Sequence, residues 1–208
     1  MKLYQFPLSP NCQKVVALAA EVGVPLELVH VDLFKGEART PELLAKNPNG
    51  KLPILEDGEF VLWESNAMLG YIAAKAERED LAPTTPRERA DVERWLSWHN
   101  AHFAPAIRKV AFERVVKKLG GLGAPDEAIV RQGTAEFAEV ARVLDRALGS
   151  KEYVTGRLTI ADFALTPAAA LAGSCGLDFT LPNASRWLAR MTARDSVRQA
   201  LAAARGAR

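Results

Sequence analysis

Two kinds of hydrophobic pattern alternate along the first 77 residues. Short apolar and aromatic runs predict strands at residues 2–6, 27–31, 54–56 and 60–62. Apolar residues at helical spacing, preceded by capping residues, predict helices from Pro10 to just before Gly23, from Thr40 to near Asn47 and from Ser65 to about Ala76. This order predicts a compact α/β unit whose first strand pair is parallel and whose edge is an antiparallel hairpin.

Beyond this unit the pattern is helical throughout. Residues 78–86, which hold Pro83 and Pro86 among charged neighbours, are predicted as a linker. Helices are then predicted over 87–118, 126–148, 159 to about 173 and 184–204. We therefore expect two domains, an α/β domain at 1–77 and an all-helical domain at 87–208.

The composition is that of a globular protein, because 49% of the 208 residues are hydrophobic and 25% are charged. The 27 basic residues nearly balance the 25 acidic ones. Two cysteines are too few for a disulfide scaffold, and the sequence contains no signal peptide or membrane span. A basic helix face near the C-terminus is predicted to be solvated rather than to bind nucleic acid; it carries Arg186, Arg190, Arg194 and Arg198. We expect a cytoplasmic protein with no membrane or nucleic-acid partner.

The bend between the first strand and the first helix carries a candidate anion site. Ser9 is predicted to cap the helix, where backbone N–H groups and the helix dipole favour an anion; a serine that only caps is the ordinary alternative. Cys12 lies three residues further, and a helix N-terminus lowers a thiol pKa. For Cys12, packing as a small apolar side chain is the favoured interpretation. The tetrad from Ser9 to Cys12 resembles a thioredoxin-type Cys-Pro-x-Cys with serine in the first position.

Two further segments carry candidate binding residues. Pro53 begins a strand, and the base rate for X-Pro bonds favours a trans peptide before it. Ser65 is predicted to cap the third helix, which offers a second N-terminal anion site, and Glu64 beside it supplies a negative charge. A ligand end with one carboxylate and one ammonium would match this pair.

Taken together, these segments resemble the cytosolic glutathione transferases, and in particular bacterial-type, serine-class, phi- or theta-like members. The resemblance rests on the strand-turn-helix Leu3–Val22 with a hydroxyl at its bend, the NPxGKLP run ending at Pro53, the Glu64-Ser65 pair and an all-helical remainder. In that remainder, Thr159-Ile160-Ala161-Asp162 matches the family's N-capping box. The resemblance implies a thioredoxin-like N-terminal domain that binds glutathione, an all-helical C-terminal domain that contributes an electrophile pocket, and a homodimer.

The resemblance also implies roles for individual residues. Ser9 corresponds to the hydroxyl that hydrogen-bonds the glutathione sulfur, and its spacing to Lys14-Val15 resembles a Ser-x4-Arg-Val pattern. Pro53 takes the family's cis-proline position, which differs from the base-rate expectation. Ala38 departs from the His-Lys pair that related classes use for the glycine carboxylate, so only the cation of Arg39 remains there. The implied glutathione-binding residues are Ser9, Arg39, Lys51, Leu52, Pro53, Glu64 and Ser65.

The long helix predicted at 87–118 carries candidate residues for an electrophile pocket and two histidines at a spacing that a metal site could use. The family's use of this helix suggests a pocket made by Phe6, Leu8, His102 and Phe103. His99 and His102 are spaced to share a metal ion, but His30 is the only other histidine and we expect no metal site. No cofactor is expected beyond glutathione as co-substrate.

Three functions are compatible with these residues. The first is a detoxifying glutathione transferase in which Ser9 stabilises the glutathione thiolate for conjugation to a small apolar electrophile. The second is a thiol-disulfide oxidoreductase that uses Cys12 through a mixed disulfide. The third is a non-catalytic binding protein with the same fold, which the joint presence of Ser9, Pro53, Glu64 and Ser65 disfavours.

Overall fold

One mixed sheet of four short strands organises the N-terminal part of the computed structural model, which describes residues 1–206. The strands are β1 (Lys2–Gln5), β2 (Glu27–His30), β3 (Ile54–Asp57) and β4 (Phe60–Leu62), in the order β2-β1-β3-β4. Strand β1 pairs in parallel with β2, and Leu3 also lies opposite Leu55 in the antiparallel pair of β1 with β3. The parallel first pair and the antiparallel hairpin β3–β4 confirm the prediction.

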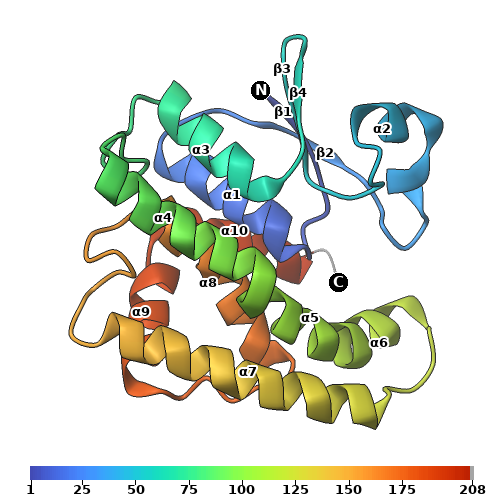
Figure 1. Ribbon diagram of the computed structural model, residues 1–208. Coiled ribbons are helices and arrows are strands. Elements are labelled where there is room, and N and C mark those ends of the chain that lie inside the picture. The colour runs from blue at the N-terminus through green and yellow to red at the C-terminus, as the bar shows by residue number, and fades with distance from the viewer. Residues whose placement is uncertain (207–208) are drawn as a thin grey trace. The chain divides into compact units, whose positions relative to one another are not determined.

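The helices of this part cover both faces of the sheet. They are α1 (Pro10–Glu21), the 3-10 turn η1 (Glu37–Arg39), α2 (Pro41–Lys46) and α3 (Ser65–Lys75). Figure 1 shows α1 and α3 along one face and α2 on the other. Strand residues alternate accordingly: Tyr4 and Ile54 belong to a buried cluster with Leu43 of α2, whereas Leu3 and Leu55 point to the opposite face and are fully buried.

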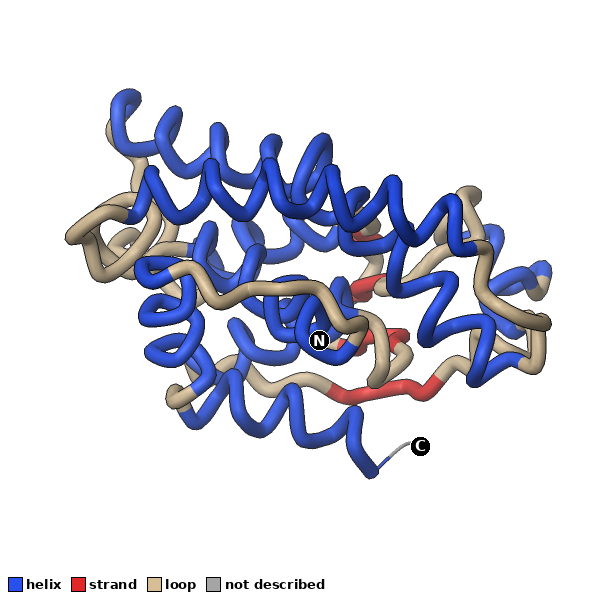
Figure 2. Tube along the Cα trace, turned by 90° about the horizontal axis from the view of Figure 1, so that it is seen from below, coloured by secondary structure: helices blue, strands red, loops and turns tan. Residues whose placement is uncertain are grey.

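The chain forms two compact units, and their boundaries differ from the predicted domains. The first unit contains Met1–Ala82 together with the segment from Ala193 onward, and the second contains Pro83–Thr192. The break at Ala82 lies inside the predicted linker. The predicted domain 87–208 is wrong at its end, because helix α10 (Asp195–Gly206) packs on α1. Figure 2 shows the strands, in red, confined to one region of a mostly helical trace.

A charged contact explains why the last helix joins the first unit. Glu21, near the end of α1, accepts hydrogen bonds from Arg194 and from the Ser196 hydroxyl, the latter at 2.5 Å. Burial opposes ionisation of Glu21, but these donors hold the pKa of its carboxyl below the usual value. Glu21 and Arg194 are more than 170 residues apart in the sequence, so no local pattern indicates that they pair.

The second unit is all helical, as predicted. One long helical run contains two π-helical stretches, where hydrogen bonds span five residues instead of four. The elements are α4 (Pro86–Trp98), η2 (His99–Phe103), α5 (Ala104–Ala111), η3 (Phe112–Val116), α6 (Lys117–Gly120), α7 (Glu127–Leu148), α8 (Ile160–Ser174) and α9 (Pro182–Thr192). The sequence pattern predicted a single helix for the run from α4 to α6 and gave no sign of the π-helical stretches.

The predicted capping box is present at the start of α8. The carboxylate of Asp162 accepts hydrogen bonds from the backbone N–H groups of Thr159 and Val154, each at 3.0 Å, and from Trp187 Nε1 at 2.9 Å. Burial raises the pKa of Asp162 to about 6, although these donors act in the opposite direction. The carboxylate thus joins the start of α8, the preceding loop and α9.

Each of the four arginines on the face predicted near the C-terminus has a polar partner. Arg190 pairs with Glu152, Arg194 with Glu21 and Arg198 with Asp195, while Arg186 donates to the carbonyl of Gly149.

Across residues 1–206, no helix is both long and apolar enough to cross a membrane.

Candidate functional site

Ser9 lies at the N-terminus of α1, in the turn that follows β1. Its amide donates to the Phe6 carbonyl at 2.9 Å, and its own carbonyl accepts from the amides of Cys12 and Gln13 at 3.0 Å. The Ser9 backbone therefore caps the helix as predicted, but its side chain accepts no capping hydrogen bond. The hydroxyl is half-buried at the positive end of the helix, where it is placed to donate to an anion.

The Cys12 thiol lies one turn inside α1 and is fully buried. It packs in the cluster that contains Phe6 and Leu52, and the Phe6 amide donates to Cys12 Sγ at 3.5 Å. Burial raises the pKa of the Cys12 thiol to about 11, which the Phe6 amide, the Ser9 hydroxyl and the charge of Lys14 only partly oppose. The expected lowering of this pKa is wrong, because desolvation exceeds the effect of the helix N-terminus. Packing as an apolar side chain is confirmed.

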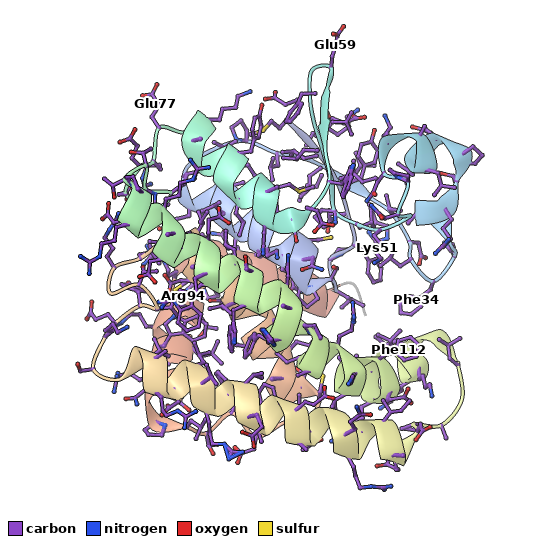
Figure 3. The ribbon with its side chains drawn as sticks, viewed as in Figure 1. Phe34, Lys51, Glu59, Glu77, Arg94 and Phe112 are labelled. Carbon is purple, nitrogen blue, oxygen red and sulfur yellow. The ribbon has the colours of Figure 1, made fainter. Side chains whose placement is uncertain are left out.

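The loop between α2 and β3 is fixed by Asn47. Its side-chain amide donates to the Lys51 carbonyl at 2.7 Å, and its own carbonyl accepts from Gly50, whose φ of 60° suits glycine. The Leu52–Pro53 peptide is cis, so the base-rate expectation of a trans bond is wrong and the cis bond that the resemblance implied is confirmed. Leu52 and Pro53 are buried, whereas Lys51, which is labelled in Figure 3, is exposed.

Arg39 lies against this loop. A Cβ added to Gly50 would come within 3.2 Å of Arg39 Cγ, so the stem of Arg39 crosses the glycine. Arg39 and Lys51 are both exposed, and the stem of Arg39 in η1 lies against the loop that carries Lys51.

The Glu64-Ser65 pair begins α3. Glu64 has a φ of 72°, a strained conformation for a residue that is not glycine. Glu64, not Ser65, occupies the cap position, and no side chain caps this helix, so the predicted capping role of Ser65 is wrong. Ser65 is instead the first helical residue and is buried, whereas Glu64 is exposed. The pair presents one hydroxyl and one carboxylate at a helix N-terminus.

A buried hydrogen bond joins the two helices that carry these residues. Lys14 Nζ of α1 donates to Asn66 Oδ1 of α3 at 2.6 Å, and Lys14 is fully buried. In the sequence, Lys14 is notable only for its spacing from Ser9, which resembles the Ser-x4-Arg-Val pattern. A lysine inside the apolar stretch of α1 indicates a buried polar contact, but its partner cannot be identified from the sequence because it lies 52 residues away.

Apolar side chains adjoin Ser9 in the first unit. Phe6 is buried, Leu8 packs against the same cluster as Phe6, and the Phe34 ring meets the Phe6 ring edge-on at 5.7 Å. Phe34 is 45% exposed and projects from its loop, as Figure 3 shows. The sequence gives no sign of Phe34 as a site residue, because its loop has no periodic pattern.

Two predicted pocket residues lie in the second unit and differ in exposure. Phe103 is fully buried and stacks on Trp98 at 5.3 Å, so its predicted contact with a ligand is wrong and it is a core residue. His102 is exposed, whereas His99 is buried, because η2 changes the helical register between them. Within residues 1–206, no three His, Cys, Asp or Glu side chains are grouped as metal ligands.

Comparisons with known proteins agree with this architecture. Residues 1–74 match the family model described as glutathione S-transferase, N-terminal domain, and residues 99–195 match the C-terminal domain model. Glutathione S-transferase 3 of Zea mays is 38% identical over 210 residues, covering 98% of this chain and 94% of the maize protein.

Solved structures of glutathione transferases are also similar to this chain. The crystal structure of glutathione transferase F7 from Populus trichocarpa has a TM-score of 0.90 at 29% identity and covers 98% of both chains. A structure described as glutathione S-transferase-I bound with the ligand lactoylglutathione has a TM-score of 0.87 at 25% identity. It covers 97% of this chain and 98% of that one.

Proposed function

Because the chain belongs to the glutathione S-transferase family, a family of transferase enzymes, we propose that it binds glutathione and transfers it to small apolar electrophiles. In this proposal Ser9 donates a hydrogen bond that stabilises the glutathione thiolate, which is the nucleophile. The observation that carries the proposal is the Ser9 hydroxyl at the N-terminus of α1 with no capping bond of its own.

The energetics are sufficient for this role. A thiol with a pKa near 8.5 is only about 3% ionised at pH 7. A hydrogen bond to a charged group contributes about 1.5–3 kcal/mol and a helix N-terminus about 0.3–1 kcal/mol. Their sum lowers the thiol pKa by roughly 1.5–3 units, since one unit corresponds to about 1.4 kcal/mol. Neither a metal ion nor a deprotonated serine is required.

The remaining residues would hold the peptide part of glutathione. In the proposal, the backbone of Leu52 before cis-Pro53 pairs with the cysteinyl moiety, and Glu64 with Ser65 holds the γ-glutamyl end. Support comes from the position of Glu64 and Ser65 at a helix N-terminus. Arg39 and Lys51 are both exposed, and in the proposal they would attract the glycine carboxylate.

The electrophile would lie against apolar side chains near Ser9. Phe6, Leu8 and the exposed ring of Phe34 supply this surface in the first unit. His102 is exposed and stays a candidate. The homodimer and the cytoplasmic location stay predictions.

The burial of Cys12 disfavours the oxidoreductase alternative. Thiol-disulfide exchange needs an accessible thiolate, whereas Cys12 is fully buried and its pKa is about 11. Sulfur chemistry on this chain is therefore assigned to the bound glutathione.

Three proteins test the proposal: the wild type, Ser9→Ala and Cys12→Ser. Each is assayed with glutathione plus a chloronitroarene and, in parallel, with glutathione plus a mixed-disulfide substrate. We expect Ser9→Ala to lower kcat/KM for conjugation about 10- to 100-fold, the value of one hydrogen bond to an anion. Cys12→Ser should retain conjugation. Full activity in Ser9→Ala would contradict the serine mechanism, and disulfide activity lost only in Cys12→Ser would support the alternative.

A further inference from the structure

A buried cation lies behind the proposed ligand site. Lys14 Nζ belongs to α1 but reaches Asn66, the second residue of α3, at 2.6 Å. Its acceptor is a neutral amide oxygen, and among the residues that the structure describes no carboxylate forms an ion pair with Lys14. A fully buried ammonium with one neutral partner is an expensive arrangement.

The helix geometry adds to this cost. The N-terminus of α3 carries partial positive charge, so a cation there is on the unfavourable end of the helix dipole. An anion at the same place would be favoured by the helix and by the lysine together. Because the helix N-terminus and Lys14 both contribute positive charge, this place favours the binding of an anionic group.

Resting on the proposed function, we infer that Lys14 is a positioning residue whose charge supports the α-carboxylate of the γ-glutamyl end of glutathione through the N-terminus of α3, so that ligand binding and protonation of Lys14 are coupled. Lys14 does not touch the ligand. It acts through Asn66, which directly follows the Glu64-Ser65 pair.

The protonation state of Lys14 is poised for such coupling. Burial lowers the pKa of Lys14 to about 7, with Glu64 and Cys12 opposing the shift. The other charged side chains on the packed elements have partners of their own: Glu21 with Arg194, Lys75 with Asp57 and, on α10, Arg198 with Asp195. On the sheet, Lys2 pairs with Glu27 and Lys46 with Glu56, and His30 lies beside Phe6.

Linkage gives the sign of the effect. An anion that binds better to the protonated form raises the pKa of Lys14, so binding takes up a proton at pH values above 7. The dissociation constant then increases as the pH rises from 6 to 9. If binding raises the pKa of Lys14 by one unit, the dissociation constant changes about tenfold over this pH range, which is an ordinary coupling strength.

The test uses S-methylglutathione, whose sulfur does not titrate, and the full chain. Calorimetry at pH 7.5 in two buffers of different ionisation enthalpy measures proton uptake, and titrations from pH 6 to 9 measure affinity. The variants are Lys14→Met, Lys14→Arg and, as a matched control on α3, Lys75→Met.

We expect proton uptake in the wild type and in Lys75→Met, with affinity falling about tenfold between pH 6 and 9. Lys14→Met should bind about tenfold more weakly at pH 6 and lose the proton uptake and pH dependence that Lys14 contributes, keeping only the part that comes from the α-ammonium of the ligand. Lys14→Arg should likewise show only this ligand-derived pH dependence.

Each contrary result is informative. Wild-type binding without proton uptake, or the same uptake in Lys14→Met, overturns the role of Lys14 and leaves the proposed function standing. The wild-type measurement needs no variant, so misfolding of Lys14→Met cannot mask the answer. Failure of the wild type to bind S-methylglutathione overturns both proposals.

Discussion

Two buried ionisable groups, one in each unit, are built in opposite ways. Asp162 sits at the N-terminus of α8, the favourable end for an anion, and accepts hydrogen bonds from Thr159, Val154 and Trp187. Lys14 reaches the N-terminus of α3, the unfavourable end for a cation, and has one neutral partner. The hydrogen bonds of Asp162 join three parts of its own fold, although burial still raises its pKa, whereas the single neutral partner of Lys14 is accounted for by the proposed coupling to a ligand.

The largest expected effect concerns the partnered group. Asp162→Ala leaves several buried donors without an acceptor, each of which costs about 1–3 kcal/mol. We expect the free energy of unfolding to fall by at least about 3 kcal/mol, measured by denaturant titration.

Asp195→Ala is the matched control, because Asp195 is exposed and forms a surface ion pair with Arg198. It should change stability by less than about 0.5 kcal/mol. An equal loss in both variants would remove the contrast between a buried network and a surface pair.

The pH dependence of stability sharpens the same point. The folded pKa of Asp162, about 6, lies above its unfolded value of 3.8, so the folded state binds the extra proton between these pH values. Wild-type stability relative to Asp162→Asn should therefore be greatest below pH 4 and fall by about 3 kcal/mol as the pH rises to 6. Denaturant titrations at pH 4, 5, 6 and 7 measure this difference. A relative stability that increases over this range would reverse the assignment.

The poorly partnered group should behave in the opposite way when it is removed. The folded pKa of Lys14, about 7, lies below its ordinary value of 10.5, so charging it costs stability below pH 7 and less at higher pH. Lys14→Met should raise the free energy of unfolding by about 1–3 kcal/mol at pH 6.5, with the gain shrinking toward pH 9. Thermal and denaturant unfolding at both pH values test this. A destabilised Lys14→Met at pH 6.5 would make Lys14 a structural residue.

The smallest effects concern the exposed cations of the first unit. Arg39→Ala and Lys51→Ala should each raise KM for glutathione about threefold at low salt, since exposed charges contribute under about 1 kcal/mol. The effect should vanish near 0.5 M salt because of screening. Lys118→Ala, an exposed lysine of the helical unit, is the control and should leave KM unchanged. Salt-independent losses would indicate direct, desolvated contacts.

Local patterns made much of the fold predictable. Strand alternation, proline at the first turn of α1 and the Thr159–Asp162 capping box act over a few residues, and each appears where it was expected. The backbone cap at Ser9 belongs to the same class. Such features depend on sterics and hydrogen bonds between residues close in the sequence, so they can be predicted from it.

Features that depend on distant partners were not predictable. The raised pKa of Cys12 follows from burial under Phe6 and Leu52, and the pairing of Glu21 with Arg194 moves α10 into the first unit. Lys14 and Asn66 meet only because α1 and α3 pack together. The π-helical stretch at His99–Phe103 separates two histidines that a regular helix would place on one face.

The pKa of the glutathione thiol in the complex tests the central claim most directly. Thiolate absorbance of the enzyme–glutathione complex, followed across pH, gives this value for the wild type and for Ser9→Ala. We predict a wild-type pKa about 1.5–3 units below that of free glutathione, with most of the shift lost in Ser9→Ala. An identical, strongly lowered pKa in both proteins would contradict the role of Ser9.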